Sequence, residues 1–318
     1  MYRPFRELIE KYDRITVYRH KSPDGDAVFS QHAFASFLKE NYPQKEVRMC
    51  GKDFCGILDN REKTDEDFIS DSLAVIFDSA NSSRIDDESY RKAQAVVKID
   101  HHPDPDLYGD LNYVDDKASA ACEILAGILF SEDFRDLILS KEVCRDLYSG
   151  IVWDTLNFST TNTTSRTLSI AAKLAEMGDL QVSEIAEHFF DMSLDTFEKV
   201  TKLRTRLTIE GRNAYILLSQ EDLDELGLSY REAKDNIAEF GHIEGIMIWS
   251  IFCFNPLTGK YDGSLRSRKG YTINGLAGKY GGGGHKNASG VKDLEREKCL
   301  SLISELTELS THDIDKTL

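Results

Sequence analysis

Apolar residues gather in short runs along the first third of the chain, and each run ends next to acidic or histidine residues. Arg14–Tyr18, Leu73–Phe77 and Ala95–Ile99 are rich in β-branched and apolar side chains, so we predict a strand for each run. Between the first two, Val28–Glu40 carries apolar residues at helical spacing. Strands that alternate with helices form a mostly parallel sheet with helices on both faces. The pattern predicts an α/β fold.

The remaining pattern predicts more helices and then a second group of strands. The predicted helices are Ser119–Phe130, Ser131–Gly150, Ser165–Met177 and the short Ile273–Lys279, and the predicted strands are Asn213–Leu218, Gly245–Phe254 and Tyr261–Arg266. A chain of 318 residues exceeds the usual size of one domain. We therefore expect a first domain over residues 1–190, a connecting helix or linker over 191–210, and a smaller α/β domain with a mixed sheet over 211–318.

Composition favours a globular protein of the cytoplasm. Hydrophobic residues make up 41% of the chain and charged residues 30%, which is ordinary for a globular protein. The longest apolar run, Gly245–Phe254, is about half of a bilayer-spanning helix, and Met1–Tyr12 lacks the apolar core of a signal peptide. We expect no membrane association. The cysteines, expected to be reduced thiols because no C-x-x-C pair occurs, are Cys50, Cys55, Cys122, Cys144, Cys253 and Cys299.

The charge distribution limits the ligands that the protein can bind. A formal net charge of −16 repels a long polyanion such as duplex nucleic acid from most of the surface. One segment, Asn255–Lys292, reverses this trend, with a local balance of +6. Its basic residues are Lys260, Arg266, Arg268, Lys269, Lys279, Lys286 and Lys292. We expect an anion, or a short nucleic acid, to bind there.

The residues that follow the first predicted strand have metal-binding chemistry. His20, Asp24 and Asp26 lie in a loop where Pro23 restricts one dihedral angle and Gly25 permits unusual ones. Carboxylates that converge in this way repel each other unless a cation lies between them. Taken alone, the same residues would also suit a turn rich in side-chain hydrogen bonds with a solvated histidine.

Further acidic and histidine residues follow the other two predicted strands. Asp78 ends the second strand, Asp100, His101 and His102 end the third, and Asp154 lies further along the chain. A single aspartate in such a position is often only a helix cap. Because the carboxyl ends of parallel strands share one sheet edge, the combined pattern instead predicts one site. Mixed carboxylate and imidazole ligands suit manganese or magnesium, and the absence of thiolates argues against structural zinc.

Two motifs resemble those of a known family. The Asp-His-His triplet at 100–102, placed after the His20–Asp26 and Asp78 clusters, resembles the DHH phosphoesterases. The segments Ser264–Ser267 and Gly281–Gly290 resemble the DHH-associated C-terminal domain, and the second of them begins with Gly-Gly-Gly-Gly-His. Together the two resemblances span nearly the whole chain, and they imply a catalytic metal-binding domain followed by a substrate-binding domain.

The resemblance also implies residue roles. It implies two divalent ions, most simply Mn²⁺ with Mg²⁺ or Co²⁺ as alternatives, whose ligand sets share Asp78. The first set is His20, Asp24 and Asp78, and the second is Asp26, Asp78, His101 and Asp154. The implied catalytic residues are Asp100, which would orient a histidine, and His102, which would face the scissile phosphate. The implied substrate-binding residues are Arg266, Gly282, Gly283, Gly284, His285 and Asn287.

At two positions the sequence departs from the family pattern. Ser22 stands where the family generally has Asn, and Leu156 stands where Gly is common. Neither position is an implied metal ligand, so the departures bear on substrate preference rather than on catalysis.

The function implied by the resemblance is a nanoRNase, an enzyme that hydrolyses very short oligoribonucleotides to mononucleotides. Relatives of this kind also dephosphorylate 3′-phosphoadenosine 5′-phosphate. The alternatives are a cyclic-dinucleotide phosphodiesterase, an inorganic pyrophosphatase or exopolyphosphatase, and a catalytically silent nucleotide-binding module. The expected partners are short single-stranded oligoribonucleotides or nucleotides, together with a second copy of the chain in a homodimer.

Overall fold

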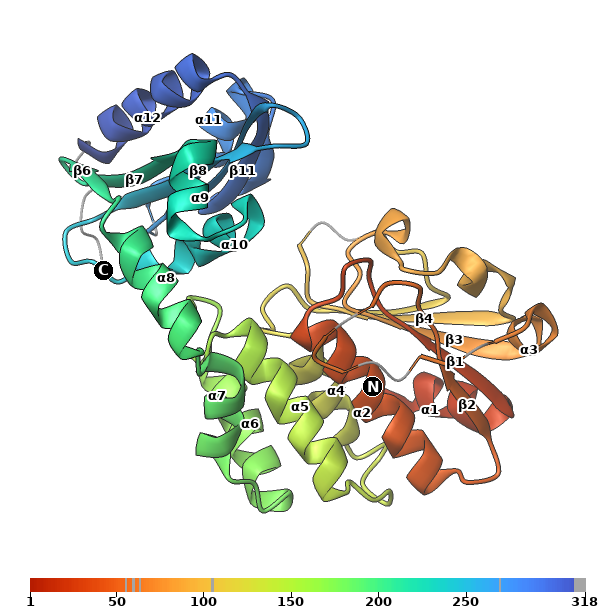
Figure 1. Cartoon of the computed structure of the whole chain (residues 1–318). Helices are drawn as coiled ribbons and strands as arrows, with labels where there is room; N and C mark the ends of the chain where they lie inside the picture. Colours follow the sequence, from red (N-terminus) through yellow and green to blue (C-terminus); the bar gives the residue numbers. More distant parts are fainter. Residues whose placement is uncertain (55, 59–60, 63, 104–105, 269, 312–318) are drawn as a thin grey trace. The chain divides into compact units, whose positions relative to one another are not determined.

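A computed structural model of the whole chain shows two units, Met1–Asp191 and Met192–Leu318, each with its own sheet and core (Figure 1). The structure describes residues 1–54, 56–58, 61–62, 64–103, 106–268 and 270–311. Cys55 and Lys269, which the sequence analysis named, lie outside the described residues.

The first unit is built on a five-stranded sheet in which every neighbouring pair is parallel, in the order β2-β1-β3-β4-β5. The strands are β1 (Arg14–Tyr18), β2 (Glu46–Met49), β3 (Ser72–Phe77), β4 (Ala95–Asp100) and β5 (Leu111–Val114). The predicted parallel α/β fold is confirmed. The two strands that the pattern did not reveal, β2 and β5, are only four residues long and lie at the sheet edges.

Strand β3 shows why these runs form a buried sheet. All six of its residues are buried. Val75 and Phe77 belong to the main core on one face, whereas Ala74 and Ile76 belong to a smaller cluster on the other face. Successive side chains of a strand point to opposite faces, so a continuous apolar run suits a strand that is covered on both sides.

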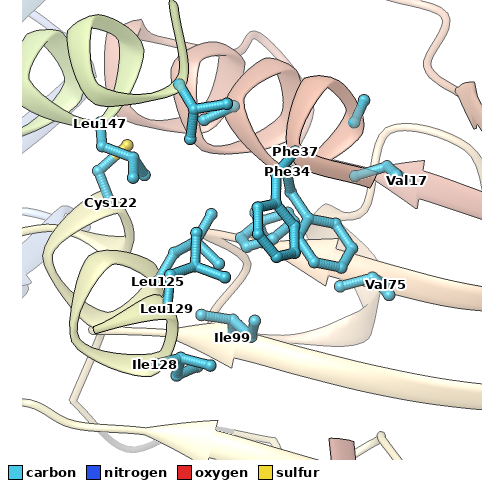
Figure 2. Close-up of a cluster of buried hydrophobic side chains, with 14 of the residues drawn as sticks. Val17, Phe34, Phe37, Val75, Ile99, Cys122, Leu125, Ile128, Leu129 and Leu147 are labelled. Atoms are coloured by element: carbon cyan, nitrogen blue, oxygen red, sulfur yellow. The ribbon is translucent and has the colours of Figure 1, made fainter. Parts of the chain in front are cut away.

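The main core lies between one face of the sheet and the helices that pack against it (Figure 2). Phe34 and Phe37 of one helix face Val75 and Ile99 of the sheet, and Leu125 comes from a second helix. The helices of this unit are α1 (Arg3–Lys11), α2 (Gly25–Asn41), α3 (Glu66–Ser70), α4 (Ala121–Leu129), α5 (Lys141–Asp154), α6 (Ser165–Met177) and α7 (Val182–Phe190), with 3₁₀ turns at Ser82–Arg84 and Glu88–Lys92.

The prediction of one helix over Ser131–Gly150 is wrong in its first half. Helix α5 begins only at Lys141, where the Ser140 side chain caps it by accepting a hydrogen bond from the Val143 N–H. The preceding residues form turns that bind the N-terminal helix: the Arg6 guanidinium bonds to Asp136, and Asp133 accepts hydrogen bonds from the first residues of the chain. These tertiary contacts override the helical pattern.

The second unit contains a mixed six-stranded sheet in the order β10-β11-β9-β8-β7-β6. Only β7 and β8 are parallel, and the other pairs are antiparallel. Its elements are α8 (Leu194–Arg204), β6 (Thr208–Glu210), β7 (Asn213–Leu218), α9 (Gln220–Leu226), α10 (Tyr230–Asp235), a 3₁₀ turn (Asn236–Phe240), β8 (Ile248–Asn255), β9 (Lys260–Ser267), α11 (Asn274–Lys279), β10 (Gly283–His285), β11 (Ala288–Leu294) and α12 (Arg296–Thr311). One core packs against α11 and α12, and a second packs against α8 to α10.

Among the described residues, no helix combines the length and the apolar character needed to cross a bilayer. The described cysteines are buried free thiols, namely Cys50, Cys122, Cys144, Cys253 and Cys299.

Candidate functional site

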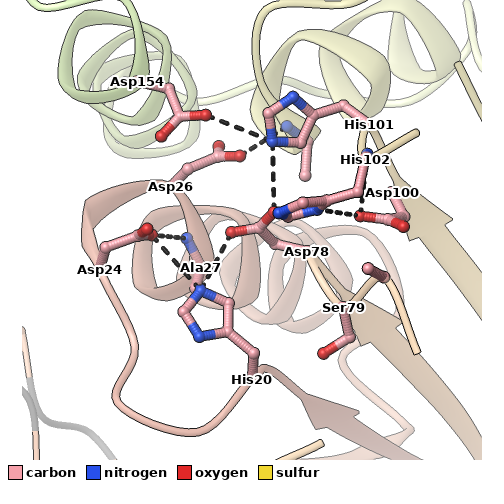
Figure 3. Close-up of polar contacts among 12 residues, drawn as sticks. His20, Asp24, Asp26, Ala27, Asp78, Ser79, Asp100, His101, His102 and Asp154 are labelled. Carbon is pink, nitrogen blue, oxygen red and sulfur yellow. Dashed lines mark hydrogen bonds and ion pairs between the residues drawn. The ribbon is translucent and has the colours of Figure 1, made fainter. Parts of the chain in front are cut away.

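The sequence-predicted metal ligands meet at one edge of the parallel sheet (Figure 3). His20 lies two residues beyond β1, Asp78 directly follows β3, and Asp100 is the last residue of β4. Parallel strands end at the same edge, so these side chains converge even though they are far apart in the sequence.

The first group consists of His20, Asp24 and Asp78, whose ligand atoms lie close enough to hold one ion. His20 Nε2 lies 3.6 Å from Asp24 Oδ1 and 3.3 Å from Asp78 Oδ2. The other ring nitrogen of His20 donates to the Lys21 carbonyl at 2.8 Å, which turns Nε2 toward the aspartates. Asp24 also caps helix α2 by accepting from the Ala27 N–H at 3.2 Å.

The second group consists of Asp26, His101 and Asp154. His101 Nε2 lies 3.3 Å from Asp154 Oδ2, at the end of α5. Asp26 is fully buried, and its two oxygens accept hydrogen bonds from the backbone N–H groups of Ala121 at 2.5 Å and Cys122 at 2.9 Å. These donors open helix α4, so its positive end holds the carboxylate in place.

Asp78 lies between the two groups. Its Oδ2 faces His20, whereas its Oδ1 lies 3.4 Å from His101 Nε2 and 3.5 Å from His102 Nδ1. The residue adopts φ +55°, a left-handed conformation that is costly for a non-glycine residue. Within the described part of the chain, the buried Oδ1 accepts no hydrogen bond. A buried carboxylate oxygen without a donor is well suited to a cation.

The electrostatics of the site also fit a cation. Burial alone would lower the pKa of His20 and His101, but the neighbouring aspartates outweigh burial and raise both pKa values to about 10. Burial and the charge of Asp78 raise the pKa of Asp26 to about 7. The pKa of Asp154 is raised well above its usual value by burial and by the nearby carboxylates. In the metal-free protein, bound protons therefore offset the negative charge of the clustered aspartates. Divalent cations bound by the same oxygen and imidazole groups would replace these protons.

Asp100 and His102 form a hydrogen-bonded pair beside Asp78. His102 Nδ1 donates to Asp100 Oδ1 at 2.8 Å, and Asp100 is fully buried. Burial would raise the pKa of Asp100, but the hydrogen bond and charge of His102 outweigh it, so this pKa is lowered. The rings of His101 and His102 lie 4.9 Å apart, and both face Asp78. The side chains of these sequence neighbours therefore lie on the same side of the site.

The two departures from the family pattern have a common conformational explanation. Ser22 adopts φ +50° and Leu156 adopts φ +44°. Asn is enriched in this left-handed region and Gly occupies it without a steric penalty, which accounts for the residues that the family generally has at these positions.

Gly25, which the sequence analysis named for its backbone freedom, and Gly150, which it did not single out, allow the helices to approach the site. A Cβ on Gly25 would lie 2.4 Å from the Trp153 ring, and a Cβ on Gly150 would lie 2.2 Å from Cys122 Sγ and 3.0 Å from Asp26 Oδ1. The position of Gly150 inside a helix could have been noticed in the sequence, because glycine destabilises a helix interior and is expected there mainly where close packing requires it.

Lys98 is a further residue that the sequence analysis missed. It is fully buried in β4, and its ammonium lies 3.2 Å from Asp100 Oδ2. The clue was a lysine inside the apolar run Ala95–Ile99, where charged side chains are rare unless they are paired.

The predicted substrate-binding residues lie in the second unit and are partly brought together by its sheet. Ala288 of β11 is paired with Arg266 of β9 on one side and with His285 of β10 on the other. Directly opposed residues point to the same face, so Arg266 and His285 share a face. The Arg266 guanidinium donates to the Leu265 carbonyl, and burial lowers its pKa.

The glycine run forms part of a hairpin between β10 and β11. A Cβ on Gly282 would lie 2.1 Å from the Gly290 carbonyl oxygen, and one on Gly284, at φ +133°, would lie 2.5 Å from that of Ala288. Glycine is therefore required at both positions by the close approach of the two strands. Gly283, by contrast, is exposed and has open space beside its Cα.

The structure also shows what several residues of the basic segment Asn255–Lys292 contact. Asn287 uses its side-chain amide to donate to Ser267 Oγ and to two backbone carbonyls, so this group holds the loop together. Lys260 and Lys279 form ion pairs with glutamates outside the segment, and Arg268 donates to three backbone carbonyls. Among the basic residues that the structure describes there, Arg266, Arg268, Lys286 and Lys292 form no ion pair with a described acidic residue.

A parallel sheet whose carboxyl edge carries aspartates and histidines, followed by a mixed-sheet unit with a glycine-rich hairpin, defines a metal-dependent phosphoesterase of two domains. The chain belongs to the DHH family. Residues 14–151 match the DHH family, N-terminal domain, and residues 215–309 match the DHHA1 domain.

Similar proteins match nearly the full length of the chain. A Streptococcus mutans protein named "Probable bifunctional oligoribonuclease and PAP phosphatase NrnA" is 35% identical over 95% of this chain and 96% of its own length. The Bacillus subtilis protein "Bifunctional oligoribonuclease and PAP phosphatase NrnA" is 31% identical, with coverage of 95% and 96%. The crystal structure of an exopolyphosphatase-related protein from Bacteroides fragilis shares the fold, with a TM-score of 0.82, 20% identity and 97% coverage of both chains.

Proposed function

We propose that this protein hydrolyses short oligoribonucleotides, including dinucleotides, to mononucleotides, and that it also converts 3′-phosphoadenosine 5′-phosphate to AMP. The observation that carries the proposal is the convergence of acidic and imidazole groups on Asp78 at the sheet edge. Full-length relatives named as oligoribonucleases and PAP phosphatases support this choice of substrates.

The proposed cofactors are two divalent ions, Mn²⁺ by preference, with Mg²⁺ or Co²⁺ as alternatives. The proposed ligands are His20, Asp24, Asp26, Asp78, His101 and Asp154, with Asp78 shared by both ions. Carboxylates and imidazoles suit these metals. When bound, such a pair of ions supplies Lewis-acid stabilisation of the phosphate and a water of lowered pKa.

The protein's own groups orient the phosphate. His102 donates its Nδ1 proton to Asp100, so its Nε2 is the ring nitrogen that remains for the substrate. We assign His102 to the scissile phosphate, where the ring with a second proton on Nε2 would donate to the phosphate oxygens and stabilise the charge that develops on them. Asp100 keeps the ring in that orientation.

The second unit is the proposed substrate-binding domain. Arg266 offers a planar guanidinium that suits a terminal phosphate, and His285 lies on the same face of the sheet. The exposed Gly283 allows a ligand to approach the backbone. In this proposal Gly282, Gly284 and Asn287 act by shaping the hairpin and its neighbouring loop.

The proposal assigns residues 1–190 to catalysis, 191–210 to a connection and 211–318 to substrate binding. It places the enzyme in the cytoplasm as a homodimer, acting on short single strands. The net charge of −16 supports short single strands as substrates, because it disfavours the binding of long duplexes.

A single substrate panel tests the proposal. The purified protein with Mn²⁺ would be incubated with 5′-labelled ribonucleotides of two to five residues, 3′-phosphoadenosine 5′-phosphate, cyclic dinucleotides and pyrophosphate. We expect mononucleotides from the linear RNAs and AMP from the adenosine bisphosphate. Failure to release mononucleotide from any linear RNA would contradict the proposal, and phosphate release from pyrophosphate alone would favour a pyrophosphatase.

A further inference from the structure

A lysine is buried behind the proposed catalytic edge. Lys98 lies in the middle of β4, and its side chain has no exposed surface. Transfer of an ammonium group from water into a protein interior is costly unless the charge is paired and hydrogen-bonded. The contacts of Lys98 therefore indicate what it does in this position.

Two of these contacts join the loops that carry site residues. The ammonium donates to the Ala80 carbonyl at 2.7 Å and to the Asp106 carbonyl at 3.0 Å. Ala80 lies two residues beyond Asp78, and Asp106 lies four residues beyond His102. One cation thus holds the two loops together.

The third contact leads into the site. Lys98 Nζ lies 3.2 Å from Asp100 Oδ2, and both side chains are fully buried. The other oxygen of this carboxylate, Oδ1, accepts the hydrogen bond from His102 Nδ1 at 2.8 Å. Within the described residues, Asp100 Oδ2 has no hydrogen-bond donor, so the lysine is its counter-charge.

A second buried lysine shows that this arrangement is not a general property of lysines in the fold. Lys45 is also buried, and its ammonium donates to the Glu10 and Tyr12 carbonyls. Its acidic neighbour, Asp13, is 3.9 Å away and almost fully exposed. Lys45 therefore binds backbone carbonyls as Lys98 does, but it holds no buried carboxylate.

We propose that Lys98 is a positioning residue for the reaction: its charge holds the Asp100 carboxylate so that Asp100 in turn fixes the His102 ring toward the substrate. The proposal rests on the phosphoesterase function proposed above. It differs from a purely structural role because it requires the positive charge, and not only hydrogen bonds to the loop carbonyls.

Matched substitutions separate the two roles. Lys98→Gln keeps an amide donor for the carbonyls but removes the charge opposite Asp100, and Lys45→Gln makes the same change away from the site. With a linear diribonucleotide and Mn²⁺, we expect Lys98→Gln to lower kcat roughly 10- to 100-fold with little change in KM. Lys45→Gln should stay within about twofold of wild type, and Lys98→Arg should recover part of the loss because it restores the charge.

A double-mutant cycle tests whether Lys98 acts through Asp100. Asp100→Asn removes the charge that Lys98 is proposed to hold, so Lys98→Gln should cause little further loss of kcat in that background. Independent, multiplicative losses would overturn the proposal.

The tautomer of His102 provides a readout that does not depend on turnover. In the metal-free protein, ¹⁵N NMR of the imidazoles should show a His102 ring whose Nδ1 is protonated and hydrogen-bonded, and this signature should disappear in Lys98→Gln but persist in Lys45→Gln. An unchanged His102 signal in folded Lys98→Gln would overturn the proposal, as would equal kcat losses in the two lysine variants. If Lys98→Gln does not fold, Lys98→Arg is used instead. A change of both kcat and the His102 ¹⁵N signal relative to wild type supports the proposal. A lower kcat with an unchanged His102 signal contradicts it.

Failure of this inference is distinct from failure of the proposed function. If the wild type releases no mononucleotide from the diribonucleotide, the function itself is wrong. If the wild type is active and Lys98→Gln matches it, only the role of Lys98 is wrong.

Discussion

At the sheet edge of the first unit, motif side chains from several segments converge on Asp78. In the hairpin of the second unit, by contrast, several motif residues are required by the backbone conformation. Gly282 and Gly284 are needed because two strands approach closely, and Asn287 binds its own loop. A motif can thus mark chemistry in one domain and chain geometry in another. The following substitutions test this contrast.

The largest effect is expected at the centre of the catalytic edge. Asp78→Ala removes a carboxylate that faces both ligand groups, so turnover of a diribonucleotide should fall by roughly 10³-fold or more. Calorimetric titration with Mn²⁺ should show loss of binding, while circular dichroism stays native. A variant with near-wild-type turnover would refute the metal assignment.

A smaller loss is expected at His102. His102→Ala removes the proposed phosphate donor but no proposed metal ligand, so kcat should fall roughly 100-fold while Mn²⁺ binding is retained. Parallel titrations and steady-state kinetics check both points. Loss of metal binding would instead make His102 a ligand, as its 3.5 Å distance from Asp78 Oδ1 permits.

In the second unit, substitution should change substrate binding rather than chemistry. Arg266→Ala should raise KM for a 5′-phosphorylated diribonucleotide roughly tenfold or more, because a charged hydrogen bond is lost, with little change in kcat. Lys260→Ala is the control, since its partner is Glu295 and the pair is exposed. An equal change in both variants would show that general charge, and not the Arg266 guanidinium, governs binding.

The stability of the two units should respond differently to pH. Folding raises the pKa of His20 from 6.5 to about 10 and that of Asp26 from 3.8 to about 7. A group whose pKa is raised in the folded state stabilises the protein below the unfolded pKa, and this stability is lost as pH rises through the folded pKa. Metal-free protein should therefore lose stability over pH 3.8–7 through Asp26 and over pH 6.5–10 through His20.

We expect the Tm of the metal-free first unit to be lower at pH 9 than at pH 6 by roughly 5 °C. Each unit contains one of the two tryptophans, Trp153 and Trp249, so fluorescence of Trp249→Phe reports the first unit and Trp153→Phe the second. Added Mn²⁺ should stabilise the first unit more at pH 9, because ions then replace fewer protons. A Tm that does not fall from pH 6 to pH 9 would contradict the assignment of these pKa values.

The smallest effect concerns backbone strain. Leu156→Gly relieves a left-handed leucine at φ +44° but adds backbone freedom to the unfolded chain, so stability should rise by only about 0.5 kcal/mol. In the hairpin, Gly284→Ala should have the opposite sign and cost about 1–2 kcal/mol, because its Cβ meets the Ala288 carbonyl. Urea unfolding measures both. Leu168→Gly, in the exposed face of α6, is the control and should cost about 1 kcal/mol.

The sequence alone determined the three central strands of the parallel sheet of the first unit, because runs such as Leu73–Phe77 are rich in apolar residues and each leads into a polar cluster. It also indicated which residues could form a metal site, since Asp78 directly follows one predicted strand and His101 lies two residues beyond another. Ser131–Ser140 was misjudged because its turn conformation depends on contacts with Arg6 and the N-terminus, which lie more than a hundred residues away in the sequence.

Only the tertiary structure decided how these residues act. From the sequence, Lys98 is only an interruption of an apolar strand; the structure shows that its ammonium binds the carbonyls of Ala80 and Asp106 in two loops. The sequence suggested that Lys260 and Lys279 bind an anion, but the structure shows that both form ion pairs with glutamates. Local propensity and periodicity act between neighbouring residues and can be read from the chain. The contacts that a charged side chain makes with other elements are set by which segments pack together, and that information exists only in three dimensions.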